Sequence, residues 1–149
     1  MQKKGQASIE AIIILAAVVF LLAVIASSLP SSLSSSQKLK DRQLAEQSVQ
    51  DIARAADEVY LAGDGASRKV WVEIVGSADF SLSFIGSRSA LDPWASRKFV
   101  SIYLSNSGDV FAISRAPMCG KWPSAIGRYQ LVVAYNSSST PHVAINDSC

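Results

Sequence analysis

A stretch without charged residues, from Ala11 to Ala26, constrains this chain more than any other feature. Counted from Ile9 to Leu29, the apolar segment has 21 residues. At a rise of about 1.5 Å per residue, such a helix is about 31 Å long and matches the hydrocarbon core of a bilayer. Lys3 and Lys4 precede the segment, and the next basic residue is Lys38, which predicts a cytoplasmic N-terminus and an exported remainder. The segment therefore predicts a helix able to span a membrane.

Composition restricts the classes of protein to which the chain can belong. The chain has 149 residues, the size of one ordinary domain. Charged residues make up 17% of it, well below the roughly 25% of soluble domains. The net charge of +2, from 14 basic and 12 acidic residues, is too small to favour a nucleic-acid interface. We expect no specific nucleic-acid partner.

An acidic residue, Glu10, stands at the start of the apolar segment. A conventional signal peptide has no such acid and ends in a small-residue cleavage site, of which Ala26-Ser27-Ser28 is a weak version. A carboxylate near a bilayer is costly and is normally retained for a partner. The alternative is that Glu10 extends to the lipid headgroups of an uncleaved anchor.

The residues around Glu10 form a recognisable pattern. Gly5 is followed by Gln6-x-Ser8-x-Glu10 and an apolar helix, which resembles the class III signal peptide of archaeal type IV pilin-like proteins. That family continues with three residues and a leucine, whereas here Ile14 takes that position and Leu15 follows it. The resemblance covers about the first 30 residues of the sequence.

The resemblance implies a processing and an assembly site. A prepilin peptidase would cut between Gly5 and Gln6, removing residues 1–5 as a leader and keeping the helix in the product. The cut would remove Lys3 and Lys4, so 12 basic residues would balance 12 acids. The new α-amino group of Gln6 would pair with the Glu10 carboxylate of a neighbouring subunit, since each charge is costly alone in an apolar bundle. The implied filament-core residues are Ile9, Ile12, Ile13, Ile14, Leu15, Val18, Val19, Phe20, Leu22 and Ile25.

A second helical pattern follows a serine-rich joint. Residues 27–36 hold seven serines and Pro30, which predicts either a kinked helix or a flexible linker. From Gln37 to Ala62 the pattern is amphipathic, and Gly63-Asp64-Gly65 is typical of a helix end. The apolar stripe consists of Leu44, Ala45, Ser48, Ile52, Ala55, Ala56 and Val59.

Short segments rich in β-branched and aromatic residues follow and predict strands. They are Val70 to Val75, Phe80 to Ile85, Phe99 to Leu104, Val110 to Ser114, Tyr129 to Tyr135 and His142 to Ile145. Residues 106–109, Asn-Ser-Gly-Asp, predict a hairpin turn between the third and fourth. We expect an α+β fold: an N-terminal helix over 6–64, apolar to about residue 29 and amphipathic after it, packed on an antiparallel β head over 65–149. That outline resembles a pilin lollipop, a helical stem with a β head.

Alternation predicts which strand residues face the helix. The expected inner face consists of Val70, Val72, Ile74, Phe99, either Val100 or Ile102, Leu104, Leu131, Val133 and Tyr135, packed on Leu44, Ile52 and Val59. The three tryptophans, Trp71, Trp94 and Trp122, are candidates for the core. Trp94 and Trp122 stand beside prolines in loops, where tryptophans either cap a core or serve contact surfaces, and we expect capping.

The exported part carries two kinds of covalent signal. Cys119 and Cys149 are expected to form a disulfide in an oxidising environment, with two separate thiols as the alternative. Asn136-Ser137-Ser138 and Asn146-Asp147-Ser148 are N-glycosylation sequons. Both signals agree with an extracellular glycoprotein.

No pattern in the sequence selects an enzyme. His142 is the single histidine and lies in a strand-like segment, and the sequence has no phosphate loop, nucleophile elbow or zinc-protease motif. One histidine and two cysteines are too few for the usual zinc site. We expect no catalytic residue, no metal and no cofactor.

The sequence leads to three functional hypotheses. The first is a structural subunit of an archaeal type IV-like pilus, inserted in the cytoplasmic membrane as a precursor and polymerised with identical subunits into an extracellular adhesive filament. The others are a minor pilin or pseudopilin of a related filament or secretion system, and a monomeric surface-binding module anchored by an uncleaved helix. Beyond residue 64, eight basic residues against five acids leave an excess of +3, which agrees with contact with an anionic surface or equally with subunit packing.

Overall fold

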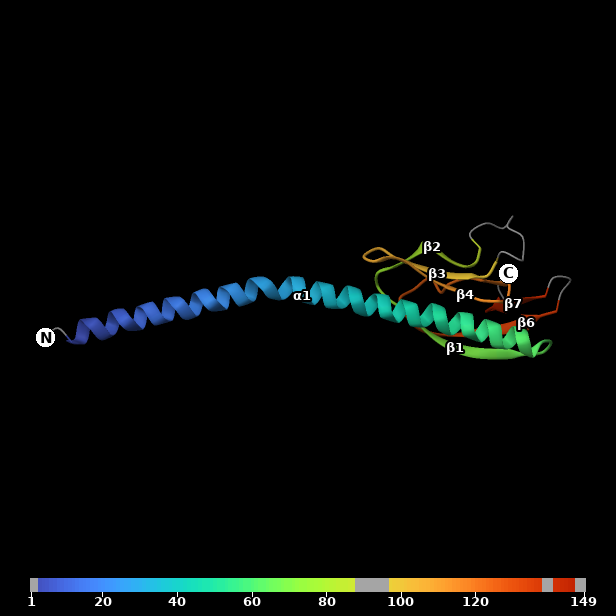
Figure 1. Ribbon diagram of the computed structural model, residues 1–149, viewed down its shortest axis with the longest axis horizontal. Coiled ribbons are helices and arrows are strands. Elements are labelled where there is room, and N and C mark those ends of the chain that lie inside the picture. Colours follow the sequence, from blue (N-terminus) through green and yellow to red (C-terminus); the bar gives the residue numbers. More distant parts are fainter. Residues whose placement is uncertain (1–2, 88–96, 138–140, 147–149) are drawn as a thin grey trace. The chain divides into compact units, whose positions relative to one another are not determined.

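The computed structural model describes residues 3–87, 97–137 and 141–146. Among these residues one α-helix, α1 (Lys3–Ala62), precedes a seven-stranded sheet (Figure 1). The strands are β1 (Ser67–Ile74), β2 (Ala78–Gly86), β3 (Phe99–Leu104), β4 (Gly108–Ile113), β5 (Met118–Gly120), β6 (Gly127–Asn136) and β7 (His142–Ile145). Contacts divide the chain into two compact units, Met1–Gln37 and Lys38–Cys149, which are described in turn.

The first unit is the apolar part of α1. Its backbone stays helical through the serine-rich joint and Pro30, so the flexible-linker alternative is not what the structure adopts. Within this stretch the Ser27 hydroxyl donates to the Val24 carbonyl at 2.8 Å, a local bond that a helix tolerates. Helix is the natural state of this segment because its backbone groups then pair internally, whether or not water is present.

The second unit begins with the amphipathic part of α1, residues 38–62. Its buried side chains recur every three or four residues, and several are alanines, which let strands approach the helix closely. They are Ala45, Val49, Ile52, Ala55, Ala56 and Val59. The helix ends at Ala62, and Gly63 and Gly65 follow with φ of 80° and 79°, as the sequence predicts.

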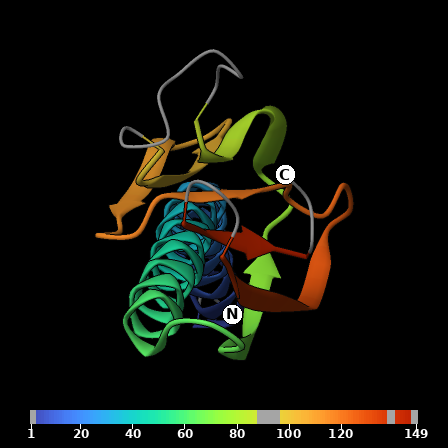
Figure 2. The same ribbon diagram turned by 90° about the vertical axis from the view of Figure 1, so that its right-hand side faces the viewer.

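The sheet curls around this part of the helix (Figure 2). The strand order is β1-β6-β7-β5-β2-β3-β4, so β1 and β4 are the two edges. The α+β class is confirmed, but a purely antiparallel head is wrong, because β5 and β7 pair in parallel. The strand β7 lies between β6 and β5 in the sheet. It pairs antiparallel with β6 and parallel with β5.

Strand alternation places one face of the sheet on the helix. Val70, Val72 and Ile74 are buried, as are Leu131 and Val133, which confirms the expected inner face in β1 and β6. In β3 both Val100 and Ile102 are buried together with Leu104. Phe99 was expected on the inner face, which is wrong: it is 40% exposed, because the pleat that turns Val100 inward turns its neighbour outward.

Strand pairing confirms the hairpin turn. Leu104 pairs with Gly108 across it, and Gly108 has φ of 81° in open space, the left-handed conformation that glycine adopts without strain. The six expected strands all form, with ends shifted by up to three residues. The sequence pattern misses β5, because three residues, Met-Cys-Gly, are too few to show alternation.

The tryptophans differ in their surroundings. Trp122 is half-buried against the core and its Nε1–H donates to the Ser101 carbonyl at 3.0 Å, which confirms the capping role. Trp71 is 53% exposed on β1, so a core position for it is wrong. Trp94 lies outside the described residues.

Candidate functional site

The first candidate site is the N-terminal part of α1. Gly5, Gln6 and Glu10 all lie in the helix, and Glu10 is exposed. The exposed fractions of the ten expected filament-core residues run from 46% for Val18 to 69% for Phe20. Within the described residues, Ile9–Ser27 is the one helical stretch long and apolar enough to cross a membrane, and none of it is buried.

This exposure has a physical consequence. The segment's mean hydropathy is 3.0 over its most apolar window, and an apolar surface of this size is not left in water by soluble proteins. A lipid bilayer, or apolar side chains packed against the segment, would remove this surface from water. Length and composition suit an anchor, a signal sequence or a helix bundle alike.

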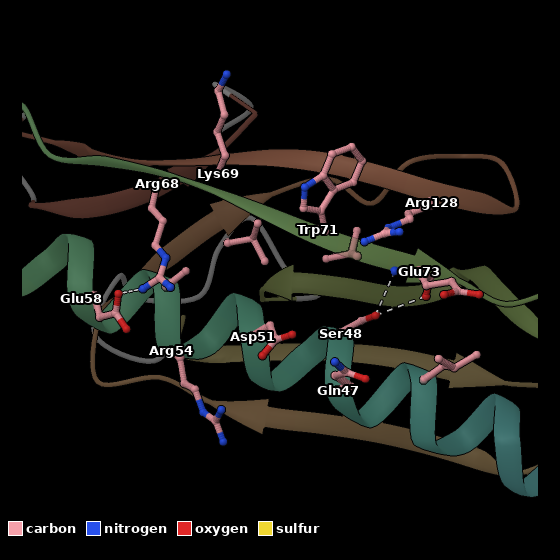
Figure 3. A pocket seen from close by; sticks show the side chains of 14 residues that line it. Gln47, Ser48, Asp51, Arg54, Glu58, Arg68, Lys69, Trp71, Glu73 and Arg128 are labelled. Carbon is pink, nitrogen blue, oxygen red and sulfur yellow. Dashed lines mark hydrogen bonds and ion pairs between the residues drawn. The ribbon is translucent and has the colours of Figure 1, made fainter.

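The second candidate site is a groove of about 590 Å³ in the second unit, between α1 and the edge strand β1 (Figure 3). Two bridges join its walls. The Ser48 hydroxyl accepts from the Glu73 backbone N–H at 3.1 Å and donates to the Glu73 carbonyl at 3.3 Å. The Arg68 guanidinium forms an ion pair with Glu58.

The groove lining is charged, and the Arg68–Glu58 ion pair lies within it. Its basic side chains are Arg54, Arg68, Lys69 and Arg128, and its acidic ones are Asp51, Glu58 and Glu73. Ser48 is 3% exposed and both of its bonds go to backbone, so it is a structural link and not an activated nucleophile. The groove lining contains no histidine.

Two carboxylates of α1 that do not line the groove accept hydrogen bonds from residues at the ends of strands. Asp41 Oδ2 accepts from the Ser77 hydroxyl at 2.7 Å. Asp57 Oδ1 accepts from the Ser114 hydroxyl at 2.6 Å and from the Arg115 N–H at 2.7 Å. The sequence does not predict these links. An acidic residue beside the apolar stripe gives the same local pattern whether its carboxylate faces water or the end of a strand.

Trp71 carries the exposed aromatic surface of β1. Its side chain points away from α1, and the Arg128 guanidinium carbon lies 5.0 Å from its ring centroid, a cation–π contact (Figure 3). The pair comes from neighbouring strands, since Glu73 and Arg128 are opposite one another in the β1–β6 register. The contact places a basic group over part of the exposed ring.

The covalent signals fall in β5, β6 and β7. Cys119 is buried and disulfide-bonded, and Cys149, the other cysteine of the chain, lies outside the described residues. Asn136 and Asn146 are both exposed, and the Asn146 side-chain oxygen accepts from the Val132 N–H at 3.0 Å. The pairing with Cys149 and the attachment of glycans stay predictions.

His142 is 4% exposed within β7, among apolar residues of the same strand. In the described part of the chain, no three histidine, cysteine, aspartate or glutamate side chains gather as metal ligands would.

Comparison with protein-family models, with curated proteins and with solved structures finds no match to this chain.

Proposed function

We propose that the chain is a structural subunit of an archaeal type IV-like pilus, processed between Gly5 and Gln6 and polymerised through its apolar helix. One observation carries the proposal: the entire segment Ile9–Ser27 is exposed along a helix that continues unbroken from Lys3 to Ala62. A membrane anchor needs only a span. The pilin outline that the motif implies joins the apolar segment to the folded domain by a single helix, and the backbone here is helical from Lys3 to Ala62.

The N-terminal sequence motif supplies the groups that processing and assembly would use. Gly5-Gln6-x-Ser8-x-Glu10 resembles the prepilin-peptidase site of archaeal pilins, and cleavage there leaves an α-amino group four residues before the Glu10 carboxylate. In an apolar bundle of subunits these two opposite charges compensate one another. We propose that the fold is pilin-like, with α1 as a helical stem and the sheet as a β head.

The second unit supports the role of a stable head. Residues 38–62 of α1 form the middle of its core, and Asp41, Ser48 and Asp57 bind the sheet at separate points. These contacts anchor this part of the helix within the second unit. We propose an extracellular pilus as the final location, with adhesion as the role of the filament.

The test is N-terminal sequencing and intact mass of the protein recovered from filaments sheared off the cell surface. We expect a chain that begins at Gln6 and is abundant in that fraction. A chain that begins near Ser27 would mean ordinary signal-peptide removal and would overturn the proposal. A chain that begins at Met1 and stays with the membrane would mean an anchored monomeric module.

A matched pair of variants sharpens the test. Gly5→Leu places a bulky side chain at the cut and is expected to leave an unshifted precursor. Gly76→Leu, at an exposed position of the second unit, is expected to leave processing unchanged. Normal processing of the Gly5 variant would contradict the assigned cleavage site.

A further inference from the structure

The second edge of the sheet, β4, carries an exposed apolar surface. Phe111 and Ile113 on β4 are 61% and 62% exposed, and Phe99 on β3, which pairs with Ile113, is 40% exposed. The three side chains share the face of the sheet that is turned away from α1, since Val110 and Val100 beside them are buried. They form one continuous patch at a sheet edge, which we name the β4 edge patch.

The backbone of β4 is also open on that side. Ser114 N–H donates to the Lys98 carbonyl at 2.8 Å, and this bond sets the alternation of the β3–β4 ladder. Ala112 therefore bonds toward β3, whereas the N–H and C=O groups of Phe111 and Ile113 point away from the sheet. Within the residues that the structure describes, no hydrogen bond reaches these groups. An apolar edge strand with open backbone groups is a template for another strand.

We propose that the β4 edge patch binds the same patch of a second copy of this chain, with the two β4 strands antiparallel about a two-fold axis at Ala112. In this register Phe111 stands opposite Ile113 of the second copy, and Ile113 stands opposite Phe111 of the second copy. Both residues are those whose backbone groups point outward, so each pair can exchange two N–H···O bonds. The two strands then continue one sheet across both molecules.

Charge selects this register. Asp109 and Arg115 are both exposed, two residues before Phe111 and two residues after Ile113. The register that pairs Phe111 with Ile113 also brings Asp109 beside Arg115 of the second copy, once on each side of the axis. A register that pairs Phe111 with itself would set Asp109 against Ile113 and leave Arg115 outside. Because the Arg115 N–H is already bound to Asp57, the backbone ladder ends at Ile113 and Arg115 contributes its side chain.

The pattern of β4 is self-complementary, which is why the partner is a second copy. A two-fold interface requires that if one residue contacts another, the reverse contact occurs as well. The outward residues read acid, apolar, apolar, base from Asp109 to Arg115, and the reversed strand presents base, apolar, apolar, acid. The inference does not rest on the proposed function, because it uses the second unit alone.

The first experiment is disulfide trapping of the full chain in detergent micelles. Ala112 would stand opposite itself in a non-hydrogen-bonded pair, where the Cα separation of about 4.5 Å suits a disulfide. We expect Ala112→Cys to give a reducible dimer under mild oxidation. The matched control is Ser105→Cys, at an exposed position in the turn before β4, and this variant should give little disulfide-linked dimer. Equal trapping at both positions would overturn the proposal, because helix association in the micelle would then explain the dimer.

The second experiment reverses the charges in the Ala112→Cys background. Asp109→Lys alone and Arg115→Glu alone each set like charges opposite one another twice, and we expect trapping to fall about tenfold in each. The double variant restores opposite charges, so trapping should return. Its recovery would also show that neither substitution prevents folding. A double variant that stays as low as the single variants would overturn the register and the two-fold contact.

Discussion

At the residue scale, the Asp57 carboxylate accepts three hydrogen bonds from the segment that follows β4. Its Oδ1 accepts from the Ser114 hydroxyl, the Arg115 N–H and, at 3.4 Å, the Ala116 N–H. Ser114 is 2% exposed, and its hydroxyl also lies 3.2 Å from the Ala116 carbonyl, a second acceptor. One helix side chain thus satisfies the turn that follows β4.

We predict that Asp57→Ala lowers the free energy of unfolding by about 1.5–3 kcal/mol, the contribution of hydrogen bonds to a charged acceptor. The measurement is chemical denaturation of the full chain in detergent with the disulfide intact. Asp51→Ala is the control, six residues earlier on the same helix and half-buried, and it should change stability by less than about 0.5 kcal/mol. Equal effects of the two variants would show that the Asp57 bonds contribute nothing specific.

Asp79, at the start of β2, is a second carboxylate with a defined environment. Its Oδ1 accepts from the Ser81 hydroxyl at 2.6 Å and from the Ser81 N–H at 2.9 Å. These bonds, the hydroxyl first and the backbone second, favour the charged form and lower the pKa of Asp79 below its ordinary value of 3.8. Because the folded pKa is the lower one, the bonds stabilise the fold above the unfolded pKa, and this contribution is lost as pH falls through the folded pKa.

We predict that Ser81→Ala raises the pKa of Asp79 toward its ordinary value, because the strongest donor to the carboxylate is removed. The measurement is an NMR titration of the Asp79 carboxyl carbon between about pH 6 and pH 2, a range that brackets ordinary aspartate pKa values. Ser124→Ala, at an exposed serine in the segment before β6, is the control and should leave the titration unchanged. An unmoved Asp79 titration in the Ser81 variant would contradict the role of the hydroxyl.

At the scale of elements, the parallel contact between β5 and β7 depends on glycine. A Cβ added to Gly120 would lie 2.7 Å from the Ile145 Cβ, closer than side chains approach one another. Ile145 is fully buried and cannot move aside. The same strand meets β2 at Gly86, which has φ of 89° and whose added Cβ would meet the Met118 carbonyl. Two glycines therefore let β5 fit between β7 and β2.

We predict that Gly120→Ala lowers the free energy of unfolding by about 1–3 kcal/mol, the cost of overpacking a well-packed site. Gly76→Ala is the matched control, since its added Cβ would meet only the Ile126 Cδ1 at 3.8 Å, an ordinary contact. Thermal unfolding of both variants in detergent checks the difference. A Gly120 variant as stable as the Gly76 variant would mean that β5 and β7 separate at little cost.

At the scale of the whole molecule, the two units have opposite relations to solvent. The second unit buries its apolar helix stripe in a closed core, whereas the first unit leaves its apolar residues exposed along the helix. The longest run of exposed apolar side chains is therefore Ile9–Ser27, and the second unit adds the β4 edge patch beside single exposed residues such as Leu61 and Ile126. Both surfaces call for other molecules, the first for lipid or subunits and the second for a second copy.

We predict that Glu10→Gln leaves processing intact but reduces filament assembly at least about tenfold, because the α-amino group of Gln6 loses its compensating charge in the apolar bundle. The measurement is the ratio of processed protein in sheared filaments to processed protein in membranes. Glu46→Gln, on the exposed side of α1 in the second unit, is the control, since its contact with Arg42 is a surface pair worth little. Normal filaments from the Glu10 variant would contradict the assembly role.

The sequence by itself determined the features that depend on local periodicity. The apolar segment, the amphipathic stripe, the helix end at Gly63 and the hairpin turn at Gly108 all follow from residues within a few positions of one another. Burial of Val70, Val72 and Ile74 follows from the same rule, because alternation in a strand is local.

Only the tertiary structure decided which distant segments meet. The strand β5, its parallel pairing with β7 and the links from Asp41 and Asp57 to the sheet join residues far apart in the chain, and nothing within a short window encodes them. The same holds for the outward side chains of Phe99 and Trp71, which are apolar yet exposed because the sheet has one face to bury and its helix covers that face alone. Local sequence sets what an element is, and the packing of elements sets which apolar surfaces are left for other molecules.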